Sequence, residues 1–227
     1  MNFIREQHLT ARLARVIPRL AVIYLLPAIM LAAAVYSALR SGAPVSDYVR
    51  DLASVASLPP LTGFFSTAGS LLWGAAAAIC YLGWAVLRHS PGDEDTAWML
   101  FWAAVMGTLL CIDDMFLLHE EVMWKSVGFG EKQFYLLYLL SGALGAWRYR
   151  RQLLRSEYLY LAAAVGLLGL SVGIDALRDA HTPWDHLLEE TPKWFGIVTW
   201  LAYWAGVCAN TLRARILGAN PGPAAGK

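Results

Sequence analysis

The chain has 227 residues, of which 58% are hydrophobic and 15% are charged, and its mean hydropathy is +0.47. This composition excludes an ordinary water-soluble domain and is typical of an integral membrane protein. The formal net charge of +1 excludes the strongly basic surface that nucleic-acid binding needs. All 3 cysteines lie in apolar runs without CxxC spacing, so neither a disulfide framework nor a thiolate metal site is expected.

Apolar runs in the sequence predict membrane-spanning helices. A helix needs about 20 residues to cross a hydrocarbon layer roughly 30 Å thick. We therefore predict an all-α integral membrane protein with six transmembrane helices, of which the fourth is the shortest. In chain order, the predicted spans cover residues 20–39, 61–87, 96–112, 133–147, 158–174 and 194–212.

The segments outside these spans are predicted to have simpler roles. Residues 1–19 form a basic amphipathic cytoplasmic segment on the membrane surface, and residues 45–57 form a short interfacial helix. Residues 20–213 are predicted to be a single transmembrane domain, followed by a flexible cytoplasmic tail at 214–227. A cleaved signal peptide is the alternative for the first span, although that run is long for the apolar part of such a peptide.

The basic residues predict how the chain is oriented. With the N-terminus inside the cell, twelve Lys and Arg residues fall on the cytoplasmic side and six on the other side. Because cytoplasmic loops are enriched in Lys and Arg, both termini are predicted to be cytoplasmic in the cell membrane. Twelve of the 17 acidic residues then fall on the outer, non-cytoplasmic side, an excess that topology rules do not explain.

Acidic and histidine side chains gather at three predicted helix ends on this outer side. They occupy residues 111–121 at the end of the third span, 175–179 at the end of the fifth, and 189–193 at the start of the sixth. Counted from the inner boundary, each site lies 18 to 20 residues along its helix, or about 27–30 Å. We expect the three junctions to form one outer-leaflet cluster, where ionised groups need a partner, a proton or a cation.

Helical spacing refines this cluster. The apolar residues 115–118 suggest that the third helix continues beyond its acidic pair. Asp113 and Glu120 would then differ by only about 20° around the helix and share a face. Asp175 and Asp179 share a face of the fifth helix through their i,i+4 spacing.

Carboxylate oxygens and imidazole nitrogens suit a divalent ion such as Zn, Mn or non-haem Fe. We therefore predict a multi-pass membrane enzyme, a divalent-metal-dependent hydrolase or oxidase, that acts on a membrane lipid or another membrane-dissolved substrate. The candidate metal ligands are Asp113, Asp114, His119, Asp175, Asp179, His181 and Asp185. The candidate catalytic residues are Glu120, Glu189, Glu190 and Lys193. Glu189 or Glu190 would act as general base, and Lys193 would hold charge.

Residues 189–193, with the sequence EETPK, begin the sixth predicted span. Pro192 suits a first helical turn, and Lys193 can pair with either glutamate of this element. The element resembles the EExxK element of glutamic-type intramembrane proteases, and residues 116–120 and 181–185 match the FxxxE and HxxxD spacings of that family. The order differs, because EExxK comes first in that family and last here. The resemblance implies peptide-bond hydrolysis as a further activity.

Two other functions would use the same residues. A proton or cation transporter would use the acids as a relay, and it predicts polar residues continuing inward, where the third and fifth spans offer little beyond Thr108 and Ser171. A non-catalytic accessory subunit of a membrane complex would present the acids to a membrane-protein partner. For any single acid, a structural ion pair at a helix end is the ordinary interpretation.

Overall fold

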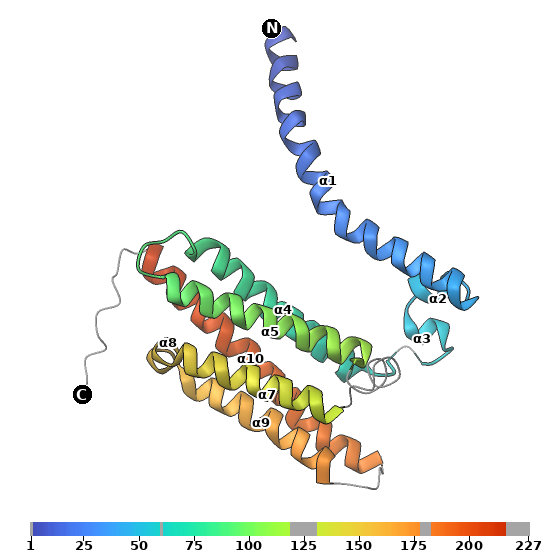
Figure 1. Cartoon of the computed structure of the whole chain (residues 1–227), viewed down its shortest axis with the longest axis vertical. Helices are drawn as coiled ribbons and strands as arrows, with labels where there is room; N and C mark the ends of the chain where they lie inside the picture. The colour runs from blue at the N-terminus through green and yellow to red at the C-terminus, as the bar shows by residue number, and fades with distance from the viewer. Residues whose placement is uncertain (1, 60, 119–130, 178–182, 217–227) are drawn as a thin grey trace. The chain divides into compact units, whose positions relative to one another are not determined.

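A computed structural model describes residues 2–59, 61–118, 131–177 and 183–216. These residues form helices joined by turns (Figure 1). Within them, five helices are long and apolar enough to cross a membrane, which supports a multi-pass membrane protein. These candidate spans are Leu20–Ser41, Phe64–Leu87, Glu94–Phe116, Tyr158–Asp175 and His186–Ile216. The chain divides into two compact units, Met1–Thr62 and Gly63–Lys227, which are described separately.

The first unit contains one long helix, α1 (Asn2–Ser41), and two single-turn helices, α2 (Ser46–Val49) and α3 (Leu52–Val55). Helix α1 is continuous, so the predicted surface segment and the first span belong to one helix. It ends before Gly42, whose φ of 72° lies in the left-handed region that glycine adopts without strain. The predicted interfacial helix at 45–57 is realised as the two short turns.

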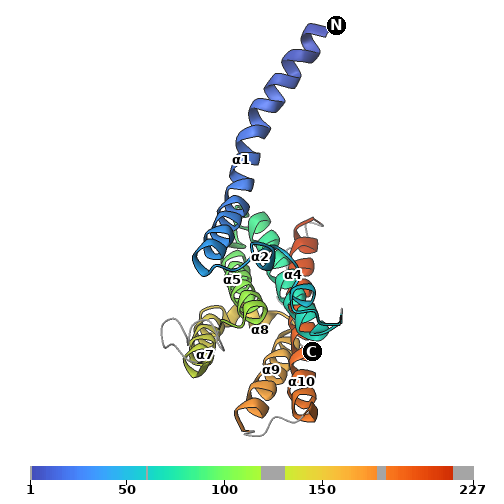
Figure 2. The same cartoon turned by 90° about the vertical axis from the view of Figure 1, so that its right-hand side faces the viewer.

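The described part of the second unit is a helical bundle. Helices α4 and α5 pack side by side, α10 packs against both α4 and α9, and α8 turns across one end of the bundle between α7 and α9 (Figures 1 and 2). The helices are α4 (Phe64–Leu87), α5 (Glu94–Phe116), α7 (Glu131–Arg148), α8 (Arg150–Arg155), α9 (Tyr158–Leu177) and α10 (Pro183–Ile216). Helix α7 coincides with the fourth predicted span but is not among the five long apolar helices.

Aromatic side chains occupy the centre of this bundle. The ring of Trp200 lies 5.5 Å from that of Trp73 and 5.7 Å from that of Trp204, and Trp204 lies 6.5 Å from Trp102. Trp204 is fully buried. Because such edge-on aromatic pairs add stability beyond the area that they bury, this row fixes α10 against α4 and α5. These tryptophans pack against one another within the bundle.

The helix boundaries at the acidic junctions differ from two predictions. Helix α5 ends at Phe116, because Leu117 adopts left-handed backbone angles (φ 50°, ψ 44°). The prediction that Asp113 and Glu120 lie on one unbroken helix was therefore wrong. The prediction that Pro192 lies in a first helical turn was also wrong, because α10 begins nine residues earlier at Pro183.

Helix α10 continues through Pro192. A proline inside a helix cannot donate to the carbonyl one turn before it. One residue earlier, the Thr191 hydroxyl donates to the Leu187 carbonyl at 2.6 Å. Pro183, by contrast, occupies the first position of α10, where a missing N–H leaves no bond unmade. Pro183, and not Pro192, is therefore the proline at the start of α10.

Candidate functional site

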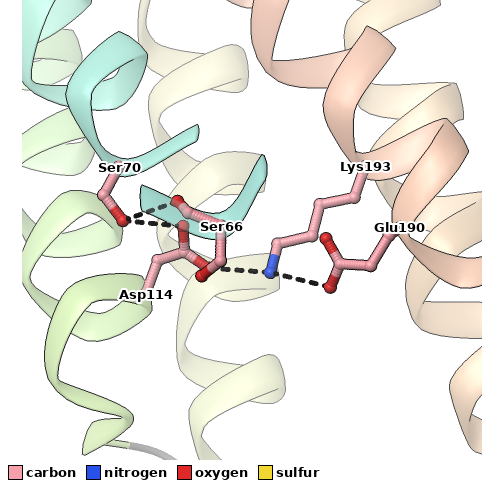
Figure 3. Close-up of polar contacts among 5 residues, drawn as sticks. All are labelled: Ser66, Ser70, Asp114, Glu190 and Lys193. Atoms are coloured by element: carbon pink, nitrogen blue, oxygen red, sulfur yellow. Dashed lines mark hydrogen bonds and ion pairs between the residues drawn. The ribbon is translucent and has the colours of Figure 1, made fainter. Parts of the chain in front are cut away.

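The acidic end of the bundle, defined by Asp114, Asp175, Glu189, Glu190 and Lys193, carries the candidate site. The Lys193 ammonium nitrogen lies 2.7 Å from Asp114 Oδ1 and 3.6 Å from Glu190 Oε1 (Figure 3). The first contact joins α10 to α5. The second is an i,i+3 pair along α10. One lysine therefore bridges acids from two of the junctions that the sequence predicts to converge.

A third helix contributes a hydroxyl group to the same carboxylate. The Ser70 hydroxyl of α4 donates to Asp114 Oδ2 at 3.0 Å and lies 3.2 Å from the Ser66 carbonyl, as Figure 3 shows. The missing side chain of Gly69 matters most for the contact between α4 and α10, because a Cβ there would lie 3.2 Å from Ile197, whereas its distance of 3.7 Å from the Asp114 carboxylate is an ordinary contact. Both oxygens of Asp114 are thus occupied.

Burial makes this ion pair different from a surface pair. The Asp114 side chain is 12% exposed and the Lys193 side chain is 29% exposed. Charges that lose most of their water require a close partner, since the desolvation penalty otherwise exceeds the Coulombic gain. The 2.7 Å contact and the serine hydroxyl supply that compensation for Asp114.

Glu189 lies among like charges on the neighbouring face of α10. It is half-buried, and its carboxylate is close enough to interact with Asp175 of α9 and with Glu190. Lys193 and His186 act on it in the opposite, attractive sense. Four described carboxylates therefore lie at this end: those of Asp114, Glu189 and Glu190 interact with Lys193, and that of Asp175 interacts with Glu189.

Asp113 occupies a separate place. It is 5% exposed, directly before Asp114 on α5, and it interacts electrostatically with Tyr138 of α7. The adjacent acids of α5 therefore face different helices, as the 100° rotation per residue requires. Asp114 is thus directed to Lys193 and Asp113 to Tyr138 of α7, and the role of the two acids as metal ligands stays a prediction.

A family comparison places this geometry in context. The family model described as Domain of unknown function (DUF8692) matches residues 22–207. The chain belongs to this family. The matched range of this DUF8692 protein includes Ser70, Asp114, Glu190 and Lys193. No curated protein and no solved structure matches the chain.

Several predicted site residues of this DUF8692 protein fall outside the described part of the chain. Asp185 belongs to α10, but its side chain is not described. The candidate residues beyond the described ranges are His119, Glu120, Asp179 and His181. Within the described ranges, no group of three or more His, Cys, Asp or Glu side chains is arranged to hold a metal ion. The metal site therefore stays a prediction.

Sequence reasoning missed Ser70. This residue is 1% exposed and lies inside the apolar run of α4. A single serine in such a run carries no signal of its own, because a hydroxyl can equally bond to its own helix. Only the packing of α4 on α5 reveals that Ser70 contacts Asp114, whose position 44 residues later gives no hint of the pairing.

Proposed function

We propose that this protein is a multi-pass membrane enzyme whose acidic end acts on a lipid or another membrane-dissolved substrate. The observation that supports the proposal is the charge imbalance of that end, where four described carboxylates lie near one described ammonium group and the His186 side chain. Ionised carboxylates beside hydrocarbon are costly, and ionisable groups inside membrane proteins usually mark functional sites. A structural ion pair needs only Asp114 and Lys193, so the additional acids favour a bound cation as their further partner.

The geometry supports distinct roles for these residues. Ser70 and Asp114 hold the Lys193 ammonium group in place, and Lys193 would stabilise negative charge that develops on a substrate. Glu189, with like-charged neighbours, would be the general base, and Glu190 would assist it. The EETPK element thus combines base and cation on one helix, which keeps peptide-bond hydrolysis among the candidate reactions.

A divalent ion, Zn, Mn or Fe, belongs to this proposal as cofactor. Of the predicted ligands that the structure describes, Asp175 is the best candidate to hold it, because Asp114 is bound to Lys193 and Ser70 and Asp113 is directed to Tyr138 of α7. The metal would supply Lewis acidity for hydrolysis, or redox chemistry for oxidation if it were iron. His119, Asp179, His181 and Asp185 are the remaining predicted ligands.

The proposed topology places the acidic end outside the cell, with six spans that include α7 and with both termini cytoplasmic. It is supported by the arginines of α7, α8 and α10, which gather at the opposite end of the bundle. Thiol labelling of intact cells with a membrane-impermeant maleimide tests this arrangement. A Thr191→Cys variant should react and a His89→Cys variant should not; the reverse pattern would contradict the orientation.

Bound metal is the first measurement for the enzyme proposal. We expect the protein purified in mild detergent to carry near-stoichiometric metal by mass spectrometry, and to turn over lipids supplied in vesicles. The double variant Asp175→Asn, Glu189→Gln should lose both properties. The matched control is Glu94→Gln, Glu157→Gln, which removes two carboxylate charges at the opposite end from exposed positions. An intact protein without metal after supplementation would remove the metal from the proposal.

A second candidate function is proton or cation transport, which one observation favours. Polar atoms continue inward from the acidic end: the Cys111 thiol lies 3.1 Å from the Ser70 carbonyl, and the Thr108 hydroxyl lies 3.5 Å from that of Tyr81. A flux assay in proteoliposomes distinguishes this function, because Thr108→Val should abolish flux without changing lipid turnover. A protein with no metal, turnover or flux would instead fit an accessory subunit.

A further inference from the structure

A second candidate site lies at the opposite end of the bundle, which we call the basic end. A pocket of about 200 Å³ opens there between the first turn of α5, the last turn of α7 and the short helix α8. Its lining is mainly basic and aromatic. The residues that line it are Asp95, Trp147, Arg148, Arg150, Arg151 and Gln152.

The polar contacts around this pocket leave positive charge in excess. Asp95 is the one acid of the lining, and it is already engaged: Arg148 lies 3.1 Å from Oδ1 and the Gln152 amide donates to Oδ2 at 3.1 Å. Arg150 donates to the Trp147 carbonyl at 2.9 Å. These bonds hold the guanidinium groups of Arg148 and Arg150 at the rim of the pocket. Of the two, only Arg148 is paired with a described carboxylate, so no described acid neutralises the charge of Arg150.

Arg151 completes the set. It is exposed, and it makes no ion pair or side-chain hydrogen bond within the described part of the chain. The lining thus holds three guanidinium groups against one carboxylate. Guanidinium forks bind phosphate oxygens in pairs, which makes a phosphate group the anion that fits such a set best.

We propose that this pocket binds the phosphate of an anionic phospholipid headgroup. Three exposed apolar side chains of α7 continue from the pocket along the helix: Leu140, Leu144 and Trp147. The arginines would then bind the phosphate of a lipid, and these apolar side chains would contact its acyl chain. The Arg150 guanidinium lies 5.6 Å from the centre of the Trp147 ring, and tryptophan is the residue that marks the membrane interface. Basic pockets between transmembrane helices on the cytoplasmic side bind anionic headgroups by this chemistry.

The inference is independent of the proposed enzyme. It uses no residue of the acidic end, and it requires only that the basic end lies at a membrane interface. A free phosphate ion would satisfy the guanidinium groups equally, but it would leave the apolar face of α7 unused. The apolar face is therefore the feature that favours a lipid over a soluble anion.

Lipid retention measured by native mass spectrometry tests the proposal. The full-length protein in mild detergent is mixed with equal amounts of phosphatidylglycerol and phosphatidylcholine, with and without millimolar inorganic phosphate. We expect selective retention of phosphatidylglycerol that inorganic phosphate does not displace. In the Arg150→Gln, Arg151→Gln variant, retention should fall about fivefold for each arginine removed.

A charge-matched variant, Arg155→Gln, Arg213→Gln, serves as the control, because both arginines are exposed and neither lines the pocket. It should retain phosphatidylglycerol within about twofold of the parent protein, since surface charges that do not touch the lipid are screened. Equal retention of both lipids, an equal loss in the control variant, or full displacement by inorganic phosphate would each overturn the proposal. The last result would identify a soluble anion as the ligand.

Discussion

The two ends of the bundle contain the same kinds of ion pair in opposite settings. At the acidic end, Asp114 and Lys193 are 12% and 29% exposed, and a buried serine completes the contact. At the basic end, Arg148 and Asp95 are 54% and 57% exposed. Because water screens exposed charges and buried charges must find partners, we expect the loss of one partner to destabilise the protein strongly at the first pair and little at the second.

The largest effect is expected from Lys193→Met, which removes the charge and keeps most of the side-chain volume. The variant leaves the Asp114 carboxylate buried beside α4 without its cation, so the free energy of unfolding should fall by about 3 kcal/mol. Denaturant titration in detergent measures this loss. Adding Asp114→Asn should recover much of it, since no buried charge then remains unpaired. A single variant as stable as the parent would show that water reaches Asp114.

A packing change in α7 should lower the free energy of unfolding by more than the loss of any ion pair at the basic end. A Cβ at Gly145 of α7 would lie 2.2 Å from the Trp102 ring, so Gly145→Ala must displace the indole ring or the helix. We expect a loss of about 2 kcal/mol. Gly142→Ala on the same helix is the control, because nothing lies within 4 Å of its Cβ position, and it should not destabilise the protein. Equal midpoints of thermal unfolding for the two variants would contradict this contact.

Ser70→Ala is expected to have an intermediate effect at the acidic end. It removes the hydroxyl that donates to Asp114 and keeps Lys193 in place, so the expected loss is about 1 kcal/mol. Ser171→Ala is the matched control, a buried serine on α9 outside the contacts of the acidic end. If both variants lose the same stability, the bond from Ser70 to Asp114 has no special contribution.

The smallest effect is expected from Asp95→Asn, which breaks the exposed pair with Arg148. The free energy of unfolding should change by less than about 0.5 kcal/mol. Raising the salt concentration should make even this difference vanish, since exposed charges are screened within about 10 Å at moderate ionic strength. A large, salt-independent loss would mean that the two ends do not differ in the way that their burial indicates.

Composition and apolar periodicity were enough to predict a helical multi-pass membrane protein. Four of the six predicted spans lie largely within long apolar helices of the bundle, and the first lies within α1. Hydropathy works here because lipid requires every backbone group to bond within its own helix. The helix boundaries were harder to predict. Leu117 ends α5 with left-handed backbone angles, and the sequence gives no signal for this because leucine rarely adopts them.

Only part of the candidate site was predictable from the sequence. The spacing of the acids indicated which helix ends would meet, and the EETPK element indicated that Lys193 would pair with a nearby glutamate. The bond between Ser70 and Asp114, the separation of Asp113 from Asp114, and the pocket of arginines beside Trp147 came only from the tertiary structure. Hydropathy is a property of each segment alone, whereas contacts between helices depend on their relative rotation and depth, which the local sequence leaves undetermined.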